Sequence, residues 1–332
     1  MPLAATRNSA ELVEGMARAY IFPGQGSQAV GMGKDLAAAY ASARAVFDEV
    51  DEALSQKLST LMFEGPEPEL TLTVNAQPAL MAMSLAVVRV LEAEAGLDLT
   101  KDAAFVAGHS LGEYSALAAA GALTISDAAR LLRRRGEAMQ QAVPPGQGAM
   151  AALLGLDYET GVAVAAEAQN DAGHGAVCTI ANDNGGGQVV ASGTKAAVER
   201  AIAIAKTKGV RRAILLPVSA PFHSALMQPA AEIMAEALAA VEIKPPKVSL
   251  VANVTAAPVK DPAEIRKLLV AQVTATVRWR ESMMFMAAQG VTLFVELGAG
   301  KVLTGLVKRI IDNASGVGVA APSEVDAYKA IH

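Results

Sequence analysis

Cysteine is almost absent from this sequence, whose 332 residues contain only Cys178. A single cysteine excludes an internal disulfide framework and favours a reducing compartment, so we expect a cytoplasmic protein. Cys178 lies in an apolar stretch and is most simply a residue of the hydrophobic core.

Charge is also scarce, with 18% charged residues and a net charge of -5. Without a basic excess, nucleic acid is not an expected partner. The first residues show no signal-peptide pattern, and polar residues and Pro78 interrupt Leu70–Val88, one of the longest uncharged stretches, so we expect no membrane partner.

Motifs for metals and cofactors are missing as well. No group of His, Cys, Asp or Glu has metal-ligand spacing. "GAGKVLTG" lacks the first glycine and the Ser or Thr of a phosphate loop, and "GQGSQAVGMG" lacks dinucleotide-binding spacing. We therefore expect neither a metal nor a cofactor.

Short apolar runs alternate with helical patterns, which predicts an α/β fold with a parallel sheet core. The expected strands are Ala19–Phe22, Ala104–Ala107, Ile214–Val218, Lys247–Val251 and Thr292–Glu296. Each leads into a loop marked by Gly or Pro. Ligands of such sheets bind beyond the carboxyl ends of the strands, so these loops are where we expect the chemistry.

Residues 146–216 show a different pattern, in which the expected order is β-α-β-β-α-β. This order is typical of a ferredoxin-like unit. We therefore predict a ferredoxin-like small domain, 146–216, inserted into a large α/β-hydrolase-like catalytic domain made of 18–145 and 217–332. Residues 1–17 are expected to be a poorly ordered lead-in.

The stretch "FVAGHSLGEYSALAAA" contains G-x-S-x-G between a predicted strand and a predicted helix. In this context Ser110 is a candidate nucleophile on a sharp turn, and the N–H of Leu111 can face a developing oxyanion. The alternative is a plain strand-to-helix turn with an incidental serine. Gly24, Gln25 and Gly26 follow the first strand, so their backbone could line the same pocket.

A serine nucleophile needs a base, and the sequence has four histidines. His109 is the neighbour of Ser110 and should point away, His174 lies in the small domain, and His332 is the last residue. His223 remains, and we expect it to follow a core strand. A capping or core histidine is the alternative.

Arg135 falls within the apolar stripe of the helix predicted over Ser126–Ala142, with Ser126 as its N-cap. Arg130, Arg133 and Arg134 point away from that stripe and suit a solvated face. A buried, unpaired guanidinium is costly, so Arg135 must meet an anion. That anion is either a structural Asp or Glu or the carboxylate of a substrate.

Seven motifs occur in an order that resembles the malonyl-CoA:acyl carrier protein transacylases of fatty acid synthesis. They are "FPGQGSQ", "NAQPAL", "GHSLGEYSAL", "RRRGEAM", "GQVVASG", "PFHSALM" and "GAGKVLTGL". The resemblance runs from about Ala19 to the region near Arg309. It implies an acyltransferase whose partners are malonyl-CoA and acyl carrier protein.

The resemblance also implies roles for individual residues. Ser110 would be the acylated nucleophile, His223 its base, and the main-chain carbonyl of Gln272 the group that orients the imidazole. Gln25 and Leu111 would supply oxyanion-hole N–H groups, and Arg135 would hold the malonyl carboxylate. His109, Gln77, Asn182 and Phe222 match further positions of the substrate pocket.

The sequence is compatible with two other functions. A serine hydrolase or thioesterase would pass the acyl group to water, but no Asp between Ser110 and His223 follows a core strand, as a hydrolase triad requires. A silent docking module for acyl carrier protein would need none of Ser110, His223 and Arg135.

Overall fold

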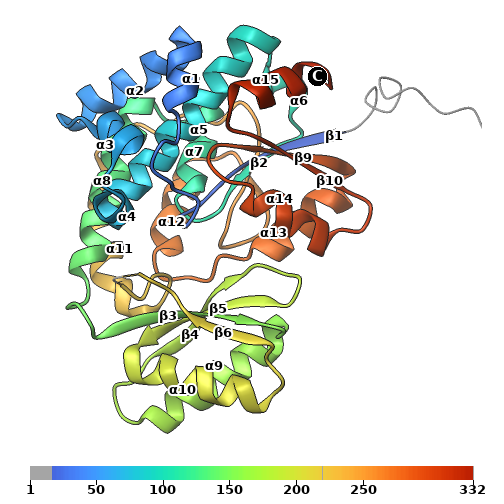
Figure 1. Ribbon diagram of the computed structural model, residues 1–332. Coiled ribbons are helices and arrows are strands. Elements are labelled where there is room, and N and C mark those ends of the chain that lie inside the picture. Colours follow the sequence, from blue (N-terminus) through green and yellow to red (C-terminus); the bar gives the residue numbers. More distant parts are fainter. Residues whose placement is uncertain (1–16, 219, 332) are drawn as a thin grey trace, which may run out of the picture.

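The computed structural model describes residues 17–218 and 220–331, which form two parts of unequal size (Figure 1). The predicted α/β class is confirmed, because a largely parallel sheet forms the larger part and an antiparallel sheet the smaller one. The predicted lead-in lies outside the described residues, apart from its last residue.

The larger part is built on a sheet of six strands in the order β10-β9-β1-β2-β7-β8. Its strands are β1 (Ala17–Phe22), β2 (Phe105–Gly108), β7 (Leu250–Val251), β8 (Pro258–Val259), β9 (Val291–Leu297) and β10 (Ser315–Val319). All neighbours run parallel except β7 and β8, which pair antiparallel. Since β1 and β2 are parallel neighbours, the loops that follow them leave the same end of the sheet.

Helices cover both faces of this sheet. They are α1 (Lys34–Ala39), α2 (Ala41–Leu54), α3 (Leu58–Glu64), α4 (Glu67–Thr71), α5 (Thr73–Ala95), α6 (Leu99–Asp102), α7 (Gly112–Ala119), α8 (Ile125–Gln141), the 3₁₀ turn η1 (Ala225–Met227), α11 (Gln228–Ala239), α12 (Pro262–Gln272), α13 (Trp279–Ala288), α14 (Val302–Ile310) and α15 (Pro322–Lys329). Tyr20 and Phe22 of β1 belong to a core shared with α5, α7 and α8. Ala19 and Ile21, which alternate with them, belong to a core shared with α13 and α14.

The helix α5 is long and apolar enough to meet the criteria for a membrane span. In this protein 89% of its most apolar window is buried inside the fold, so α5 is a central core helix. Its burial is consistent with a soluble protein.

The smaller part is inserted between α8 and η1. It consists of β3 (Gly148–Leu154), α9 (Tyr158–Ala172), β4 (Cys178–Asp183), β5 (Gln188–Thr194), α10 (Lys195–Thr207) and β6 (Arg212–Leu215). Its sheet order, β4-β5-β3-β6 with antiparallel neighbours, is that of a ferredoxin-like unit. The helices α9 and α10 cover the sheet face that points away from the larger part (Figure 1). Cys178 belongs to the core beneath them, as predicted.

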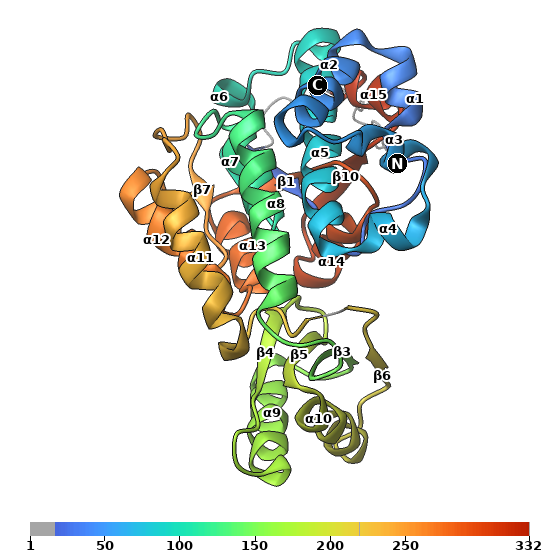
Figure 2. The same ribbon diagram turned by 90° about the vertical axis from the view of Figure 1, so that its left-hand side faces the viewer.

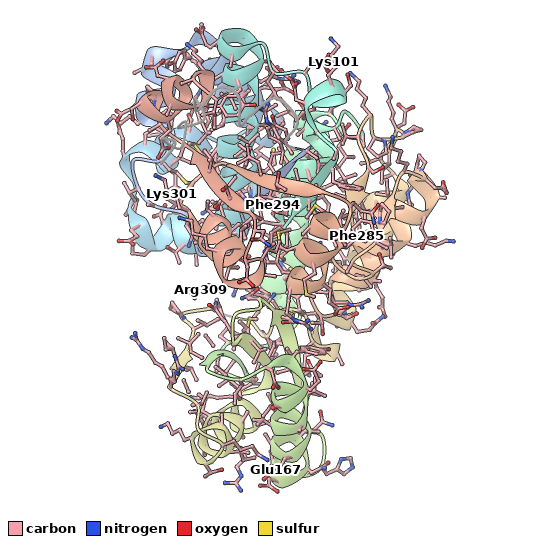
Figure 3. All side chains as sticks on the ribbon, turned by 90° about the vertical axis from the view of Figure 1, so that its right-hand side faces the viewer. Lys101, Glu167, Phe285, Phe294, Lys301 and Arg309 are labelled. Carbon is pink, nitrogen blue, oxygen red and sulfur yellow. The ribbon has the colours of Figure 1, made fainter. Side chains whose placement is uncertain are left out.

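The two parts meet near the carboxyl ends of β1 and β2. The long helix α8 runs down the larger part and ends at the smaller one (Figure 2). Arg309 of α14 lies at the boundary, whereas Glu167 of α9 marks the far tip (Figure 3). The loop between β4 and β5 reaches back to α14, since a Cβ added to Gly186 would lie 2.6 Å from the Cβ of Arg309.

Some local predictions are wrong. The expected core strand 214–218 is absent: β6 ends at Leu215 and belongs to the small sheet, while 216–218 form no strand. His223 therefore follows an irregular segment. Ser126 lies inside α8, and the actual N-cap is Thr124, whose side chain accepts a hydrogen bond from the N–H of Asp127. The strand β10 was not predicted, because its "SGVGV" sequence has few bulky apolar residues.

Candidate active site

Ser110 lies on the turn between β2 and α7 with φ = 54°, in the left-handed region that residues with a Cβ rarely adopt. Two glycines make this turn possible. A Cβ on Gly108 would lie 1.9 Å from the backbone of Gly112, and a Cβ on Gly112 would lie 2.3 Å from the carbonyl oxygen of Phe22. The strand and helix thus approach too closely for side chains, and the Ser110 side chain is presented at the start of α7.

Gly108→Ala is expected to destabilise the fold by about 3 kcal/mol, because backbone atoms must move to admit the methyl group. The measurement is the midpoint of chemical denaturation. Gly305→Ala is the matched control: Gly305 is exposed within α14, none of the described residues lies within 4 Å of an added Cβ, and alanine should stabilise by roughly 0.5–1 kcal/mol. Equal midpoints for the two variants would contradict the steric account of the turn.

The structure brings His223 to Ser110. The Oγ atom of Ser110 lies 2.8 Å from Nε2 of His223, and Nδ1 of His223 lies 2.8 Å from the carbonyl oxygen of Gln272. A carbonyl only accepts, so Nδ1 carries the proton and Nε2 offers its lone pair to the serine hydroxyl. His223 also has a left-handed backbone, with φ = 55°. The pair has the geometry of a nucleophile and its base.

Arg135 is 2% exposed and lies beside this pair. Its Nη1 donates to Oε1 of Gln77 at 2.7 Å, and its Nη2 donates to Oε1 of Gln272 at 2.9 Å and to Oγ of Ser110 at 3.2 Å. Among the described residues no carboxylate lies within 4 Å of this guanidinium. Its contacts are neutral oxygens, which leaves the positive charge available to an anionic ligand.

Hydrogen bonds continue from Arg135 to the loop after β1. The amide of Gln77, whose oxygen accepts from Arg135, donates through Nε2 to Oγ1 of Thr73 at 2.9 Å. Thr73 in turn donates to Oε1 of Gln25 at 2.9 Å. Because each donor has a defined acceptor, this chain fixes the loop that holds Gln25 relative to Arg135.

All the residues with a predicted role in the site, except Gln272, line one cavity of about 220 Å³. They are Gln25, Gln77, His109, Ser110, Leu111, Arg135, Asn182, Phe222 and His223. Of the two glycines beside Gln25 that were expected here, Gly26 lines the cavity and Gly24 does not. Gln272 is fully buried beside them. Met139, Met150, Leu216 and Val218 add an apolar wall, and sequence reasoning did not select them.

The backbone N–H groups of Gln25 and Leu111 face no acceptor in the described part of the chain. Leu111 immediately precedes α7, whose N-terminal end favours negative charge. Two free N–H groups beside a serine hydroxyl form a suitable site for an oxyanion.

Burial sets the charge states of the site. It lowers the pKa of His223 to about 3, with a further contribution from the Arg135 charge, so His223 is neutral at physiological pH. Burial also lowers the pKa of His109. A neutral imidazole that accepts from Ser110 is the form that a general base requires.

Several residues of the site were missed. Asn253 follows β7 and bridges the turn, since its Nδ2 donates to the Gly108 carbonyl at 2.7 Å and its Oδ1 accepts from the Ser110 N–H at 2.8 Å. Glu113 is buried below Ser110, and Asn184 holds His109 at 2.9 Å. The sequence did offer two signals for them. Asn253 lies in the loop after the predicted strand Lys247–Val251, and Glu113 ends the "GHSLGE" motif.

The prediction for Arg133 is wrong. This residue is half-buried and donates to Oδ1 of Asn75 at 2.9 Å and to Oε1 of Gln56. It therefore ties α8 to α5 instead of lying on a solvated face. Arg130 and Arg134 are exposed, as expected.

No group of three or more His, Cys, Asp or Glu residues that could hold a metal ion occurs within 17–218 and 220–331. The site is thus made of a serine, a histidine, an arginine and amide groups. Such a set can acylate a serine and bind an anion next to it.

Comparison with known proteins gives concordant results. The acyl transferase domain model matches residues 19–323. The chain is 48% identical over 308 residues to the malonyl CoA-acyl carrier protein transacylase of Bacillus subtilis strain 168, covering 93% of this chain and 95% of the relative. It is 47% identical over 309 residues to that of Escherichia coli K12, covering 93% and 97%.

Solved structures agree with these matches. The crystal structure of acyl-carrier-protein-S-malonyltransferase from Bartonella henselae has a TM-score of 0.91 and 54% identity, covering 95% of this chain and 99% of that one. A malonyl-transacylase in complex with a type II PKS acyl-carrier protein has a TM-score of 0.91 and 41% identity, covering 95% and 100%.

Proposed function

This chain belongs to the malonyl CoA-acyl carrier protein transacylases of the acyl transferase family, and we propose that it works through a malonyl ester of Ser110. It is an acyltransferase that moves the malonyl group from coenzyme A to acyl carrier protein. The main support for this mechanism is the contact of 2.8 Å between Ser110 Oγ and His223 Nε2, beside the buried guanidinium of Arg135.

In the first half-reaction the Ser110 oxygen attacks the thioester carbonyl of malonyl-CoA. His223 Nε2 takes the hydroxyl proton, while Gln272 accepts a hydrogen bond from Nδ1 and stabilises the imidazolium. The oxyanion of the tetrahedral intermediate accepts from the N–H groups of Gln25 and Leu111. The carbon–sulfur bond then breaks, and the imidazolium gives its proton to the leaving thiolate.

In the second half-reaction the phosphopantetheine thiol of acyl carrier protein takes the place of coenzyme A. His223 accepts the thiol proton, the sulfur attacks the ester carbonyl, and the Ser110 oxygen leaves with that proton. The enzyme returns to its starting state, and the transfer follows a ping-pong sequence.

Arg135 selects the acyl group. In this proposal its guanidinium binds the malonyl carboxylate. No carboxylate of the described residues contacts the guanidinium, so none competes with the substrate for it. Gln77 holds Nη1 of the guanidinium at the required place. Asn182, His109 and Phe222 complete the walls of the pocket.

The proposal includes the compartment in which the enzyme acts and the pathway that it supplies. The single cysteine favours the cytoplasm, where the enzyme would supply malonyl groups to fatty acid synthesis. The chemistry needs no cofactor, because serine, histidine and the thioester supply every reacting group.

Intact-mass measurement after mixing the protein with malonyl-CoA tests the mechanism. We expect the chain to gain the mass of one malonyl group and peptide mapping to place it on Ser110. The adduct should disappear when acyl carrier protein carrying phosphopantetheine is added. An unmodified chain would refute the proposal, and rapid loss of the adduct to water without acyl carrier protein would indicate a hydrolase.

A further inference from the structure

Glu113 is a buried carboxylate next to the reacting groups that the mechanism above does not use. It is the second residue of α7 and is 1% exposed. Its Oε2 accepts a hydrogen bond from Nε2 of Gln272 at 2.7 Å and from the backbone N–H of Asn253 at 3.2 Å. A buried carboxylate is costly, so its retention beside the nucleophile requires an explanation.

Gln272 connects Glu113 to both functional side chains. Its amide nitrogen donates to Glu113 and to the Ser110 carbonyl at 3.0 Å, and its amide oxygen accepts from Arg135 at 2.9 Å. An ionised carboxylate only accepts and a guanidinium only donates. The two charges therefore fix which end of the amide faces which neighbour. The backbone carbonyl of Gln272 accepts from His223 at 2.8 Å.

The charge of Glu113 matters in addition to its hydrogen bonds. Among the described residues no carboxylate contacts Arg135 directly, and Glu113 lies one amide group away from it. The ionisable groups whose charges couple to Glu113 are Arg135 of α8 and its own neighbour Tyr114. Gln272 of α12 and Asn253, which follows β7, present only uncharged groups.

We propose that Glu113 is a positioning residue of the transferase, which holds Arg135 and His223 through Gln272 and balances the Arg135 charge before malonyl-CoA binds. This inference rests on the proposed function. Two effects follow from it. The carboxylate weakens the attraction of Arg135 for the malonyl carboxylate, and it supports the positive charge that His223 acquires during the reaction.

Glu113→Gln separates the charge from the hydrogen bonds, because the glutamine oxygen can accept from Gln272 and Asn253 as the carboxylate does. We expect the KM for malonyl-CoA to fall by about 3- to 10-fold, because the variant removes a negative charge that lies near the bound malonyl carboxylate and repels it. We expect kcat to fall by about tenfold, because His223 becomes a weaker base. The KM for acetyl-CoA, which lacks the carboxylate, should stay the same.

Glu296→Gln is the matched control. Glu296 is also buried and accepts hydrogen bonds from the N–H groups of Leu303 and Thr304, but it lines no part of the cavity. This variant should keep both KM values and kcat. A general effect of removing a buried charge would instead appear in both variants.

The wild-type protein offers an independent test that needs no folded variant. Burial raises the pKa of Glu113 to about 7, so lowering the pH from about 8.5 to about 5.5 should neutralise it. The pKa of His223 is about 3, so this imidazole should stay neutral throughout the interval, and burial also lowers the pKa of His109 below its usual value. We expect wild-type kcat and KM for malonyl-CoA to approach the Glu113→Gln values at low pH.

Three results would overturn the inference. They are a Glu113→Gln variant with unchanged kcat and KM, a KM for malonyl-CoA that rises, or a difference from wild type that does not depend on pH. Failure of the proposed function would look different, because the wild-type protein itself would then form no adduct on Ser110. If Glu113→Gln does not fold, the wild-type pH series alone decides: kinetic constants without the expected change would refute the inference.

Discussion

Ser110→Ala is expected to abolish the malonyl adduct and to lower transfer to acyl carrier protein by about 10⁴-fold or more, since no other group can replace a nucleophile. The fold should tolerate the change, because the turn is held by backbone contacts of Gly108 and by Asn253. Intact-mass measurement with malonyl-CoA reports the adduct, and a transfer assay reports the rate.

Ser115→Ala is the control for this experiment. Ser115 belongs to the same helix α7, is fully buried, and its hydroxyl has no hydrogen-bond partner in the described part of the chain. The variant should form the adduct at the wild-type rate. A malonyl adduct that persists in Ser110→Ala would show that another residue is the nucleophile and that the close contact with His223 has a structural role.

The turn at Ser110 and the burial of Arg135 could be predicted because both depend on short-range pattern. Two glycines around a serine, between an apolar run and a helix, have few other uses. A charged residue within an apolar stripe at helical spacing must be buried if the helix forms. The structure places Ser110 and Arg135 as this local reasoning requires.

His223 was reached by a different route, and part of that route was wrong. Elimination among the histidines selected the residue, yet the strand expected before it is absent. The position of His223 depends on the contact of Nδ1 with the carbonyl of Gln272, which is 49 residues away in the sequence. A main-chain acceptor of this kind has no residue type, so spacing and periodicity cannot reveal it, and only the resemblance to the transacylases indicated Gln272.

Glu113 and Asn253 were missed for a related reason. Glu113 contacts Gln272 and the backbone of Asn253, and Asn253 contacts the backbone of the Ser110 turn. In each of these pairs the two residues are 140 or more positions apart in the sequence. A glutamate at the start of a helix is ordinarily explained by the helix dipole. Only the packed structure shows that this carboxylate is buried and bonded to the amide that holds Arg135. The acid sought for a hydrolase triad thus has a counterpart, but one that contacts an amide instead of the histidine.

Arg135→Ala is expected to reverse the preference between acyl groups. Malonyl transfer should fall by about 10²- to 10³-fold, the usual cost of removing one partner of a buried ion pair. Acetyl transfer should be spared or should rise, because acetyl-CoA has no carboxylate to pair and the variant leaves more room. The measurement is kcat/KM for both substrates on the same protein preparation.

The ratio of the two kcat/KM values is the decisive quantity. Removing Arg135 also takes hydrogen bonds from Gln77, Gln272 and Ser110, and that loss should affect both substrates alike. Arg134→Ala is the control, because Arg134 lies on the same helix with its side chain 51% exposed and forms an ion pair with the surface residue Glu137 at 3.8 Å. It should leave the ratio unchanged. An equal decrease for malonyl and acetyl transfer in Arg135→Ala would mean that the guanidinium orders the catalytic pair without recognising a carboxylate, whereas a selective decrease would assign it the acyl specificity.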